Sequence, residues 1–246
     1  MRIAVLIAHP DYAALFCGGT LIKHIQKGDE AFVVAMSPGE IGAAFKHPDK
    51  SVEELAAIKT SEFQATARVQ GVTEARVLRF PDTKIANSPE LRLTIIDLIR
   101  EFKPDLVITH WPQGGHPDIR ATAQAVIDAC FFAYLPAIQT AHPAHQVKKL
   151  YAFGETAASD NFDPDVFIDI SDVIDAKIEA ARCNTAMVEE ISALFSKGDP
   201  NPDAWANIFL GPNMYWGQES GVKYAEPFKE IRIHGLGKRA LPALPV

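Results

Sequence analysis

The sequence has few cysteines and no long apolar run. Its first apolar run, residues 3–8, is much shorter than the roughly 20 residues that span a bilayer, and His-Pro-Asp follows it in place of a signal-peptide cleavage site. The three cysteines, Cys17, Cys130 and Cys183, have spacings that fit neither a zinc knuckle nor a disulfide framework. These absences predict a cytoplasmic protein without a membrane span.

Positive charge is also in short supply. Lys and Arg number 24 against 31 Asp and Glu, the formal net charge is -7, and no basic cluster is longer than Lys148-Lys149. Proteins that bind nucleic acid present a basic surface to the phosphates, so nucleic acid is not an expected partner. The chain also lacks G-x-G-x-x-G, and this absence disfavours a nicotinamide or flavin enzyme. The motifs G-x-S-x-G and G-x-x-x-x-G-K-[ST] are absent as well.

What the sequence does contain is an alternation of two patterns. Short runs rich in Val, Ile and Phe predict strands that are covered on both faces, at residues 2–8, 31–37, 76–80, 105–111, 149–153 and 166–170. Helical periodicity lies between them, at residues 14–27, 52–70, 89–102 and 119–134. The alternation predicts an α/β fold: a Rossmann-like, doubly wound, mostly parallel sheet with helices on both faces.

The C-terminal third predicts one long helix followed by irregular chain. The helix covers about residues 172–196, with Ser171 and Asp172 as plausible caps. From about residue 198 the chain is rich in Pro, Gly and Asn, and we expect an irregular segment that lies against the site. No repeat or linker divides the chain, so residues 1–246 are expected to form a single domain.

The same tripeptide follows two of the predicted strands. His9-Pro10-Asp11 comes after the first strand, and His116-Pro117-Asp118 comes shortly after the strand that contains His110. His-Pro-Asp can be purely structural, because proline sets the turn and aspartate caps the next helix. Ligands of open α/β sheets bind beyond the carboxyl ends of the strands, however, and two copies at such ends favour a site built for acid/base or metal chemistry.

Seven blocks of sequence carry a resemblance to a known family. They are "AHPDYAALFCGGTL" (8–21), "SPGEIG" (37–42), "KTSEFQATARVQGV" (59–72), "RFPD" (79–82), "KPDLVITHWPQGGHPDIRAT" (103–122), "FDPDVFIDISDVIDAKIEA" (162–180) and "SGVKYAEPF" (220–228). In this order they resemble the PIG-L/LmbE-like zinc-dependent deacetylases. The resemblance implies hydrolysis of N-acyl groups from amino sugars and related glycoconjugates.

The resemblance also implies roles for individual residues. His9 matches a zinc ligand, and Asp11 matches the carboxylate proposed as general base toward the metal-bound water. His116 matches the histidine that assists the tetrahedral intermediate or protonates the leaving amine. Asp118 matches an acidic residue that orients its neighbours, and Asp82 matches a substrate-contacting aspartate.

Two positions depart from the family pattern. Tyr12 stands where the family has its second zinc ligand, an aspartate, and Ile119 stands where it has its third, a histidine. A catalytic zinc normally has three protein ligands and one open position, so His9 alone would bind it weakly. Isoleucine offers no donor atom, and a tyrosine with a pKa near ~10 is costly to ionise at neutral pH.

Three readings follow from this pattern. In the first, the chain is a metal-dependent hydrolase that recruits substitute ligands such as Asp11, His110 or Asp118. In the second, no metal takes part: Asp11 and His116 act as an acid/base pair and Tyr12 donates to a developing oxyanion, which suits elimination or hydration. In the third, the chain is a non-catalytic binding protein or a partner subunit.

We expect the site in a crevice between residues 9–13, 37–45, 82 and 110–119, with Asp82, His110 and Glu40 as substrate contacts. The expected partner is a small polar substrate, and the sequence also allows a homo-oligomer. The favoured activity is a PIG-L/LmbE-like hydrolase acting on the N-acyl group of an amino sugar or another small polar substrate, with an altered metal site.

Overall fold

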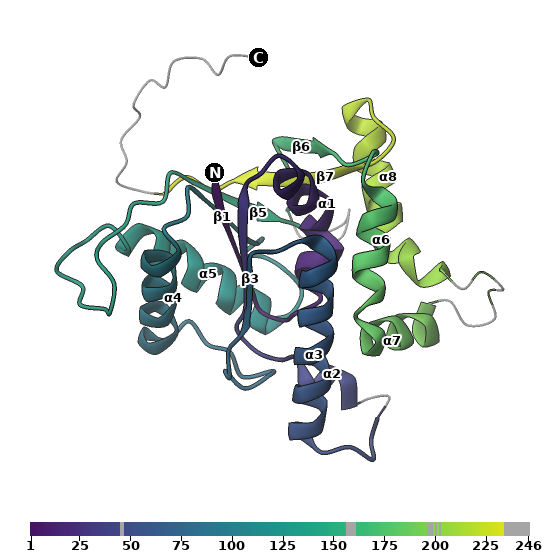
Figure 1. The fold of residues 1–246 in the computed structure, drawn as a ribbon, viewed down its shortest axis with the longest axis horizontal. Coiled ribbons are helices and arrows are strands. Elements are labelled where there is room, and N and C mark those ends of the chain that lie inside the picture. The colour runs from purple at the N-terminus through teal and green to yellow at the C-terminus, as the bar shows by residue number, and fades with distance from the viewer. Residues whose placement is uncertain (45–46, 156–160, 196–198, 200, 202, 234–246) are drawn as a thin grey trace.

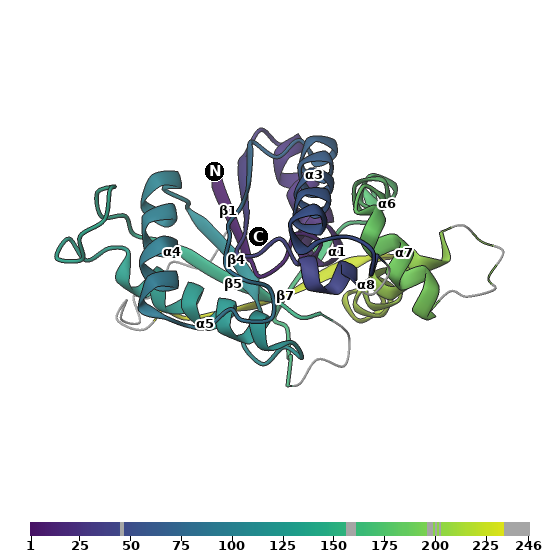
Figure 2. The same ribbon diagram turned by 90° about the horizontal axis from the view of Figure 1, so that it is seen from below.

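The computed structural model describes residues 1–44, 47–155, 161–195, 199, 201 and 203–233. Seven strands form one sheet with the order β3-β2-β1-β4-β5-β7-β6 (Figures 1 and 2). The strands are β1 Arg2–Ile7, β2 Glu30–Ala35, β3 Glu74–Val77, β4 Leu106–His110, β5 Lys149–Phe153, β6 Val166–Asp169 and β7 Ala225–Glu230. Strands β1 to β5 are mutually parallel, whereas β7 runs antiparallel to both β5 and β6. The predicted mostly parallel sheet is thus confirmed.

Helices cover both faces of this sheet. They are α1 Tyr12–Gln26, α2 Glu40–Ala44, α3 Val52–Gln70, α4 Pro89–Phe102, α5 Pro117–Phe132, α6 Ile174–Arg182, α7 Thr185–Phe195 and α8 Asn207–Ser220, with a 3-10 turn η1 Ala204–Ala206. Helices α4 and α5 lie on one face, and α1 and α3 lie on the other (Figure 2). In the part of the chain that the structure describes, no helix is long and apolar enough to cross a membrane.

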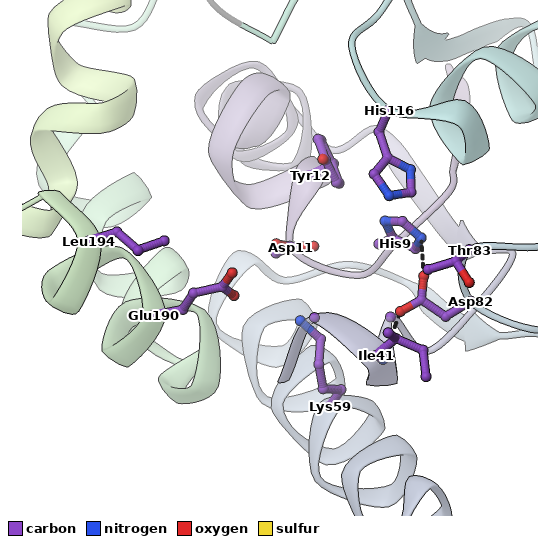
Figure 3. A pocket seen from close by; sticks show the side chains of 12 residues that line it. His9, Asp11, Tyr12, Ile41, Lys59, Asp82, Thr83, His116, Glu190 and Leu194 are labelled. Carbon is purple, nitrogen blue, oxygen red and sulfur yellow. Dashed lines mark hydrogen bonds and ion pairs between the residues drawn. The ribbon is translucent and has the colours of Figure 1, made fainter. Parts of the chain in front are cut away.

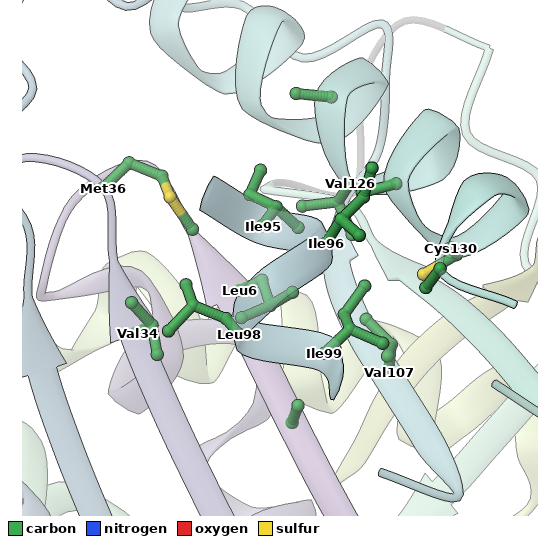
Figure 4. Close-up of a cluster of buried hydrophobic side chains, with 14 of the residues drawn as sticks. Leu6, Val34, Met36, Ile95, Ile96, Leu98, Ile99, Val107, Val126 and Cys130 are labelled. Atoms are coloured by element: carbon green, nitrogen blue, oxygen red, sulfur yellow. The ribbon is translucent and has the colours of Figure 1, made fainter. Parts of the chain in front are cut away.

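The central strand β1 shows why the predicted strands read as unbroken apolar runs. Successive side chains point to opposite faces of a strand, and here both faces are covered. Leu6 packs with Val34, Val107 and residues of α4 and α5 in one cluster (Figure 4). Val5, its neighbour in sequence, belongs to the cluster on the other face with α1 and α3. Both side chains are fully buried.

The order of the strands places a crevice beside β1. The chain moves outward from β1 through β2 to β3, then returns to add β4 on the opposite side of β1. Helices that follow β1 and β4 therefore leave the sheet on opposite faces, and their loops separate at the carboxyl ends of these strands. His9 and His110 stand at these two strand ends.

The prediction for the C-terminal third is wrong in two respects. The single helix is interrupted at Cys183 and Asn184, so that α6 and α7 are separate. The segment expected to be irregular contains α8 and strand β7, which pairs with β5 and β6. Helix α8 contains Pro212, and Gly217 passes so close to the backbone of Lys223 that a Cβ would lie 2.6 Å from its carbonyl oxygen. Tertiary packing therefore overrides a composition that is typical of loops.

A buried ion pair connects this C-terminal part to the first helix. The ammonium of Lys177 on α6 lies 2.7 Å from Glu226 Oε1 on β7 and donates to Asn213 Oδ1 on α8 at 2.8 Å. The Glu226 carboxylate also accepts from the backbone N–H groups of Gly19 (2.9 Å) and Thr20 (2.7 Å) inside α1. Both charged side chains are fully buried. The pair thus fixes α1, and with it the loop that precedes α1.

Removing the ammonium should destabilise the fold strongly. In a Lys177→Met variant the Glu226 carboxylate stays buried without its countercharge, which costs about 3–5 kcal/mol of unfolding free energy. Urea unfolding followed by circular dichroism measures this. Lys148→Met is the matched control, because Lys148 pairs with Asp105 at the surface with 72% of its side chain exposed, and its loss should cost less than about 1 kcal/mol. Equal losses in the two variants would contradict the assignment.

Candidate functional site

A cavity of about 450 Å³ opens at the carboxyl ends of the central strands. Its base is formed by side chains from the loops after β1, β3 and β4, and its far wall comes from α2, α3 and α7 (Figure 3). The lining residues are His9, Asp11, Tyr12, Gly39, Ile41, Gly42, Lys59, Asp82, Thr83, His116, Glu190 and Leu194. The volume suits a small-molecule ligand, since such pockets span about 300–1,000 Å³.

His9 lies between two carboxylates at the base of this cavity. Its Nε2 is 3.0 Å from Asp82 Oδ1 and 3.2 Å from Asp118 Oδ2. Burial alone would lower the pKa of His9, but the hydrogen bonds to Asp118 and Asp82 outweigh it and raise the pKa to about 9. Burial opposes the ionisation of Asp82 in the same way, yet the bond to His9 lowers its pKa to about 2. In this arrangement His9 is an imidazolium at neutral pH.

Asp118 connects His9 to the loop after β3. Its side chain is fully buried and accepts from the backbone N–H groups of Thr83 (2.7 Å) and Ile85 (3.2 Å). These bonds place Asp82, which precedes Thr83, against His9. Asp118 therefore orients its neighbours across three loops, as the resemblance implies.

His116 begins helix α5 and faces the cavity. Its Nδ1 accepts from the backbone N–H of Asp118 at 3.2 Å, so it caps the helix with its ring. Because a backbone N–H is always the donor, Nδ1 carries no proton and the proton of the neutral ring sits on Nε2. The His116 and His9 ring centroids are 5.3 Å apart and nearly perpendicular. The two tripeptides thus meet at one site.

Asp11 is available for chemistry because it does not cap its helix. It occupies the N-cap position of α1, yet its side chain makes no capping hydrogen bond. Its Oδ1 is buried and has no hydrogen-bond partner among the described residues. The purely structural interpretation of His-Pro-Asp requires capping aspartates, and neither Asp11 nor Asp118 caps the helix that follows it.

Tyr12 contributes a neutral hydroxyl to the cavity. Burial, and then the negative charge of Asp11, raise the pKa of the phenol far above its ordinary value near 10. The ring lies edge-on to His110, with 4.9 Å between the centroids, and stacks with Phe16 at 5.7 Å. Tyr12 can therefore donate a hydrogen bond but does not supply a phenolate.

His110 and Glu40, expected as substrate contacts, do not line the cavity. His110 is fully buried and its Nε2 accepts from the N–H of Ala8 at 2.9 Å, which joins β4 to the end of β1. Burial holds the pKa of His110 well below its usual range, so the ring is neutral. Glu40 is 8% exposed and turns toward the Ser37 hydroxyl (3.4 Å) and the Asp82 N–H (3.5 Å).

The donor atoms present do not fit a catalytic zinc ion. Among the described residues, the group whose donor atoms lie close enough together is His9, His116 and Asp118, all within 4.8 Å of one another. Two of these are already bonded to each other, and both oxygens of Asp118 accept backbone hydrogen bonds. Ile119 is fully buried in the apolar core, and Tyr12 is a neutral phenol. For these three residues to hold zinc with an open fourth position, the hydrogen bond between His9 and Asp118 would have to be given up.

Four lining residues were not predicted as site residues: Lys59, Thr83, Glu190 and Leu194. Thr83 follows Asp82 directly and has a positive φ of 66°, which no sequence pattern signals. Glu190 and Leu194 lie on α7, where helical periodicity predicts the element but not which element it faces. The residues Asn184 and Thr185, which favour a new helix start, were the signal for α7 itself.

The family model for the PIG-L family, described as GlcNAc-PI de-N-acetylase, matches residues 4–130. This range holds His9-Pro10-Asp11, His116-Pro117-Asp118 and Asp82, and it covers more than half of the chain. The chain belongs to the PIG-L family.

Relatives of this PIG-L protein match across most of its length. It is 28% identical over 239 residues to a diacetylchitobiose deacetylase of Thermococcus kodakarensis, covering 94% of this chain and 83% of the relative. It is 26% identical to a 1D-myo-inositol 2-acetamido-2-deoxy-alpha-D-glucopyranoside deacetylase of Actinosynnema mirum, covering 76% and 81%. The structure of N,N'-diacetylchitobiose deacetylase from Pyrococcus horikoshii superposes with a TM-score of 0.79 at 26% identity, covering 94% and 83%.

The two aspartates of this PIG-L site should respond oppositely to neutralisation. Asp118→Asn removes a carboxylate that accepts from His9 and two backbone N–H groups, and should lower the unfolding free energy by about 1–3 kcal/mol. Asp11→Asn removes a partly buried carboxylate whose Oδ1 has no hydrogen-bond partner among the described residues, and should leave stability unchanged or raise it slightly. Urea unfolding of the two isosteric variants decides this, and a larger loss for Asp11→Asn would show that the assignment is reversed.

Proposed function

We propose that this protein hydrolyses the N-acyl group of an amino sugar or of another small polar substrate, and that it does so without the zinc of its family. The observation that carries the proposal is the convergence of Asp11, Tyr12 and His116 on one cavity in a chain of the PIG-L family. Two relatives are named as deacetylases, one of diacetylchitobiose and the other of an acetamido glucopyranoside. Their names support an acetamido sugar as the first substrate to test.

The residues can divide the reaction as follows. The unpartnered carboxylate of Asp11 takes a proton from a water molecule, whose oxygen then attacks the acyl carbon. The Tyr12 hydroxyl donates to the oxygen that becomes negative. As the carbon–nitrogen bond breaks, the proton that Asp11 took from water passes to the departing nitrogen, while the Nε2–H of His116 donates a hydrogen bond to the oxygen that bears the negative charge. The products are a carboxylic acid and an amine, and Asp11 is again a carboxylate.

The zinc ion of the family would polarise the acyl carbonyl and activate water. We propose that substitution has removed two of its three protein ligands here, where Tyr12 and Ile119 now stand. What supports this is the donor chemistry: Tyr12 holds its proton and Ile119 packs in the core. His9 is left bonded to Asp82 and Asp118.

Activity should survive chelation and depend on Asp11 and His116. Incubated with diacetylchitobiose and EDTA, the protein should release primary amine at the rate seen without EDTA, as measured with fluorescamine. Asp11→Asn and His116→Gln should each lower that rate about 10²–10⁴-fold, because the first removes the proton-transfer group and the second removes a donor to the oxygen that becomes negative. His142→Gln, at the surface pair with Asp97, is the control and should have no effect. Loss of activity with EDTA would contradict the metal-free assignment.

Restoring the two ligand types should restore zinc binding. A Tyr12→Asp/Ile119→His variant should purify with close to one zinc per chain, whereas the unaltered protein should hold far less. Elemental analysis of protein purified without chelators measures this. His9→Ala added to the variant should abolish the gain, because it removes the third ligand. Stoichiometric zinc in the unaltered protein would overturn the proposal that the ligand set is lost.

A second candidate function is metal-free proton transfer in an elimination or hydration at an activated carbonyl compound. One observation favours it: a neutral phenol stands beside an unpartnered carboxylate and a histidine in the same cavity. Without a metal, these groups would have to lower a higher activation barrier for amide cleavage than for removal of an acidic proton. If no acetamido sugar is cleaved, Asp11-dependent exchange of pyruvate methyl protons for deuterium would support this candidate. The absence of both reactions would favour a non-catalytic binding protein.

A further inference from the structure

We propose that Glu190 is a specificity-determining residue, which forms with Lys59 a subsite for the hydroxyl groups of an uncharged sugar ring. The substrate class rests on the function proposed above, while the subsite itself rests on the geometry of the far wall of the cavity. Glu190 on α7 and Lys59 on α3 both line the cavity and point into it, opposite the His9 and His116 side (Figure 3).

One face of helix α3 carries Lys59 and also binds the start of α7, the helix that carries Glu190. Glu62 Oε1 accepts from the Thr185 hydroxyl and from the Ala186 N–H (3.0 Å), which are at the start of α7. One turn further along α3, the Thr66 hydroxyl accepts from Asn184 Nδ2 at 3.0 Å. Lys59 precedes Glu62 by three residues and so lies on the same helix face. The contacts that dock α7 on α3 therefore also set Glu190 across from Lys59.

Apolar packing also holds α7 in place. Met187 and Ile191 are buried in a cluster with Trp205 and Phe209. Glu190, on the same helix, points into the cavity (Figure 3). A helix held both by hydrogen bonds at its start and by apolar packing presents a side chain in a defined place, which is what a recognition residue requires.

Lys59 is a buried cation that lacks a contacting partner. It is 7% exposed, and its ammonium has no carboxylate within 4 Å and no hydrogen bond among the described residues. The side chain borders the cavity, so a ligand oxygen bound there can accept a hydrogen bond from this ammonium.

Glu190 on the far wall and Asp11 opposite it together place an excess of negative charge around Lys59. Its half-buried carboxylate forms no ion pair within the described part of the chain, and it feels both the attraction of Lys59 and the repulsion of Asp11. With two carboxylates against one ammonium, an anionic ligand group is repelled here. A hydroxyl is favoured instead, because it donates to the carboxylate in a charge-assisted bond while a neighbouring hydroxyl accepts from the ammonium.

Binding measurements with two sugars test this inference. Isothermal titration calorimetry with diacetylchitobiose and with N-acetylmuramic acid, which adds a carboxylate, should show that the unaltered protein prefers the uncharged sugar. Glu190→Gln should weaken diacetylchitobiose binding by about 10-fold and should narrow the preference over N-acetylmuramic acid, because it removes both a charged acceptor and the repulsion. Lys59→Met should weaken both sugars.

Glu189→Gln is the matched control. Glu189 is the neighbouring residue, has 58% of its side chain exposed and lies 3.5 Å from His47, outside the cavity lining. Its substitution should leave both affinities unchanged. An unchanged preference in Glu190→Gln, or no binding of either sugar to the unaltered protein, would overturn the inference. If the sugars bind with the predicted preference but no amine is released, the proposed hydrolytic function is contradicted and the proposed subsite is supported.

Discussion

The carboxylate of Asp118 is the interaction on which the site depends. It is fully buried at the start of α5, and its hydrogen bonds reach the loop after β3 and the residue after β1. Parallel strands bring these loops to one edge of the sheet, but they do not by themselves fix the side chains. Asp118 does so, because one planar group with two oxygens must satisfy His9 and two backbone donors at once. The position of Asp82 follows from the same bonds.

The same tripeptide performs two different tasks in this fold. In both copies proline stands near the first turn of a helix, where its fixed φ is favourable. In the second copy His116 is the cap, and Asp118 is free to bond elsewhere. In the first copy no side chain caps α1, and the Asp11 carboxylate is left without a partner beside the cavity. A group that costs stability and faces a cavity is more readily explained by function than by folding.

Prediction from the sequence succeeded where the determining interactions are local. Apart from the short helix α2, which was not predicted, the strands and helices up to residue 132 follow from periodicity, and strand ends place His9 and His116 together. It failed where the determining contact is distant. Glu226 is 207 positions away from the residue of α1 that it contacts. This contact holds the C-terminal segment, whose composition is typical of a loop. His110 at the end of β4 and Glu40 at the start of α2 lie in the segments expected to form the crevice, but burial and hydrogen bonds turn them away from the cavity.

Tyr12 and Ile119 connect the edge of the cavity to the core. Ile119 is fully buried among apolar residues, and its Cγ2 lies so near Gly114 that a Cβ there would be only 2.7 Å away. Tyr12 packs against His110 and Phe16. Both side chains thus add contacts to the core. At the base of the cavity, His9 is hydrogen-bonded to Asp82 and Asp118. Asp11, Lys59 and Glu190, by contrast, keep their hydrogen-bonding capacity for a ligand. Residues whose hydrogen bonds are made within the protein therefore build this cavity, whereas residues without such bonds can form them with a ligand.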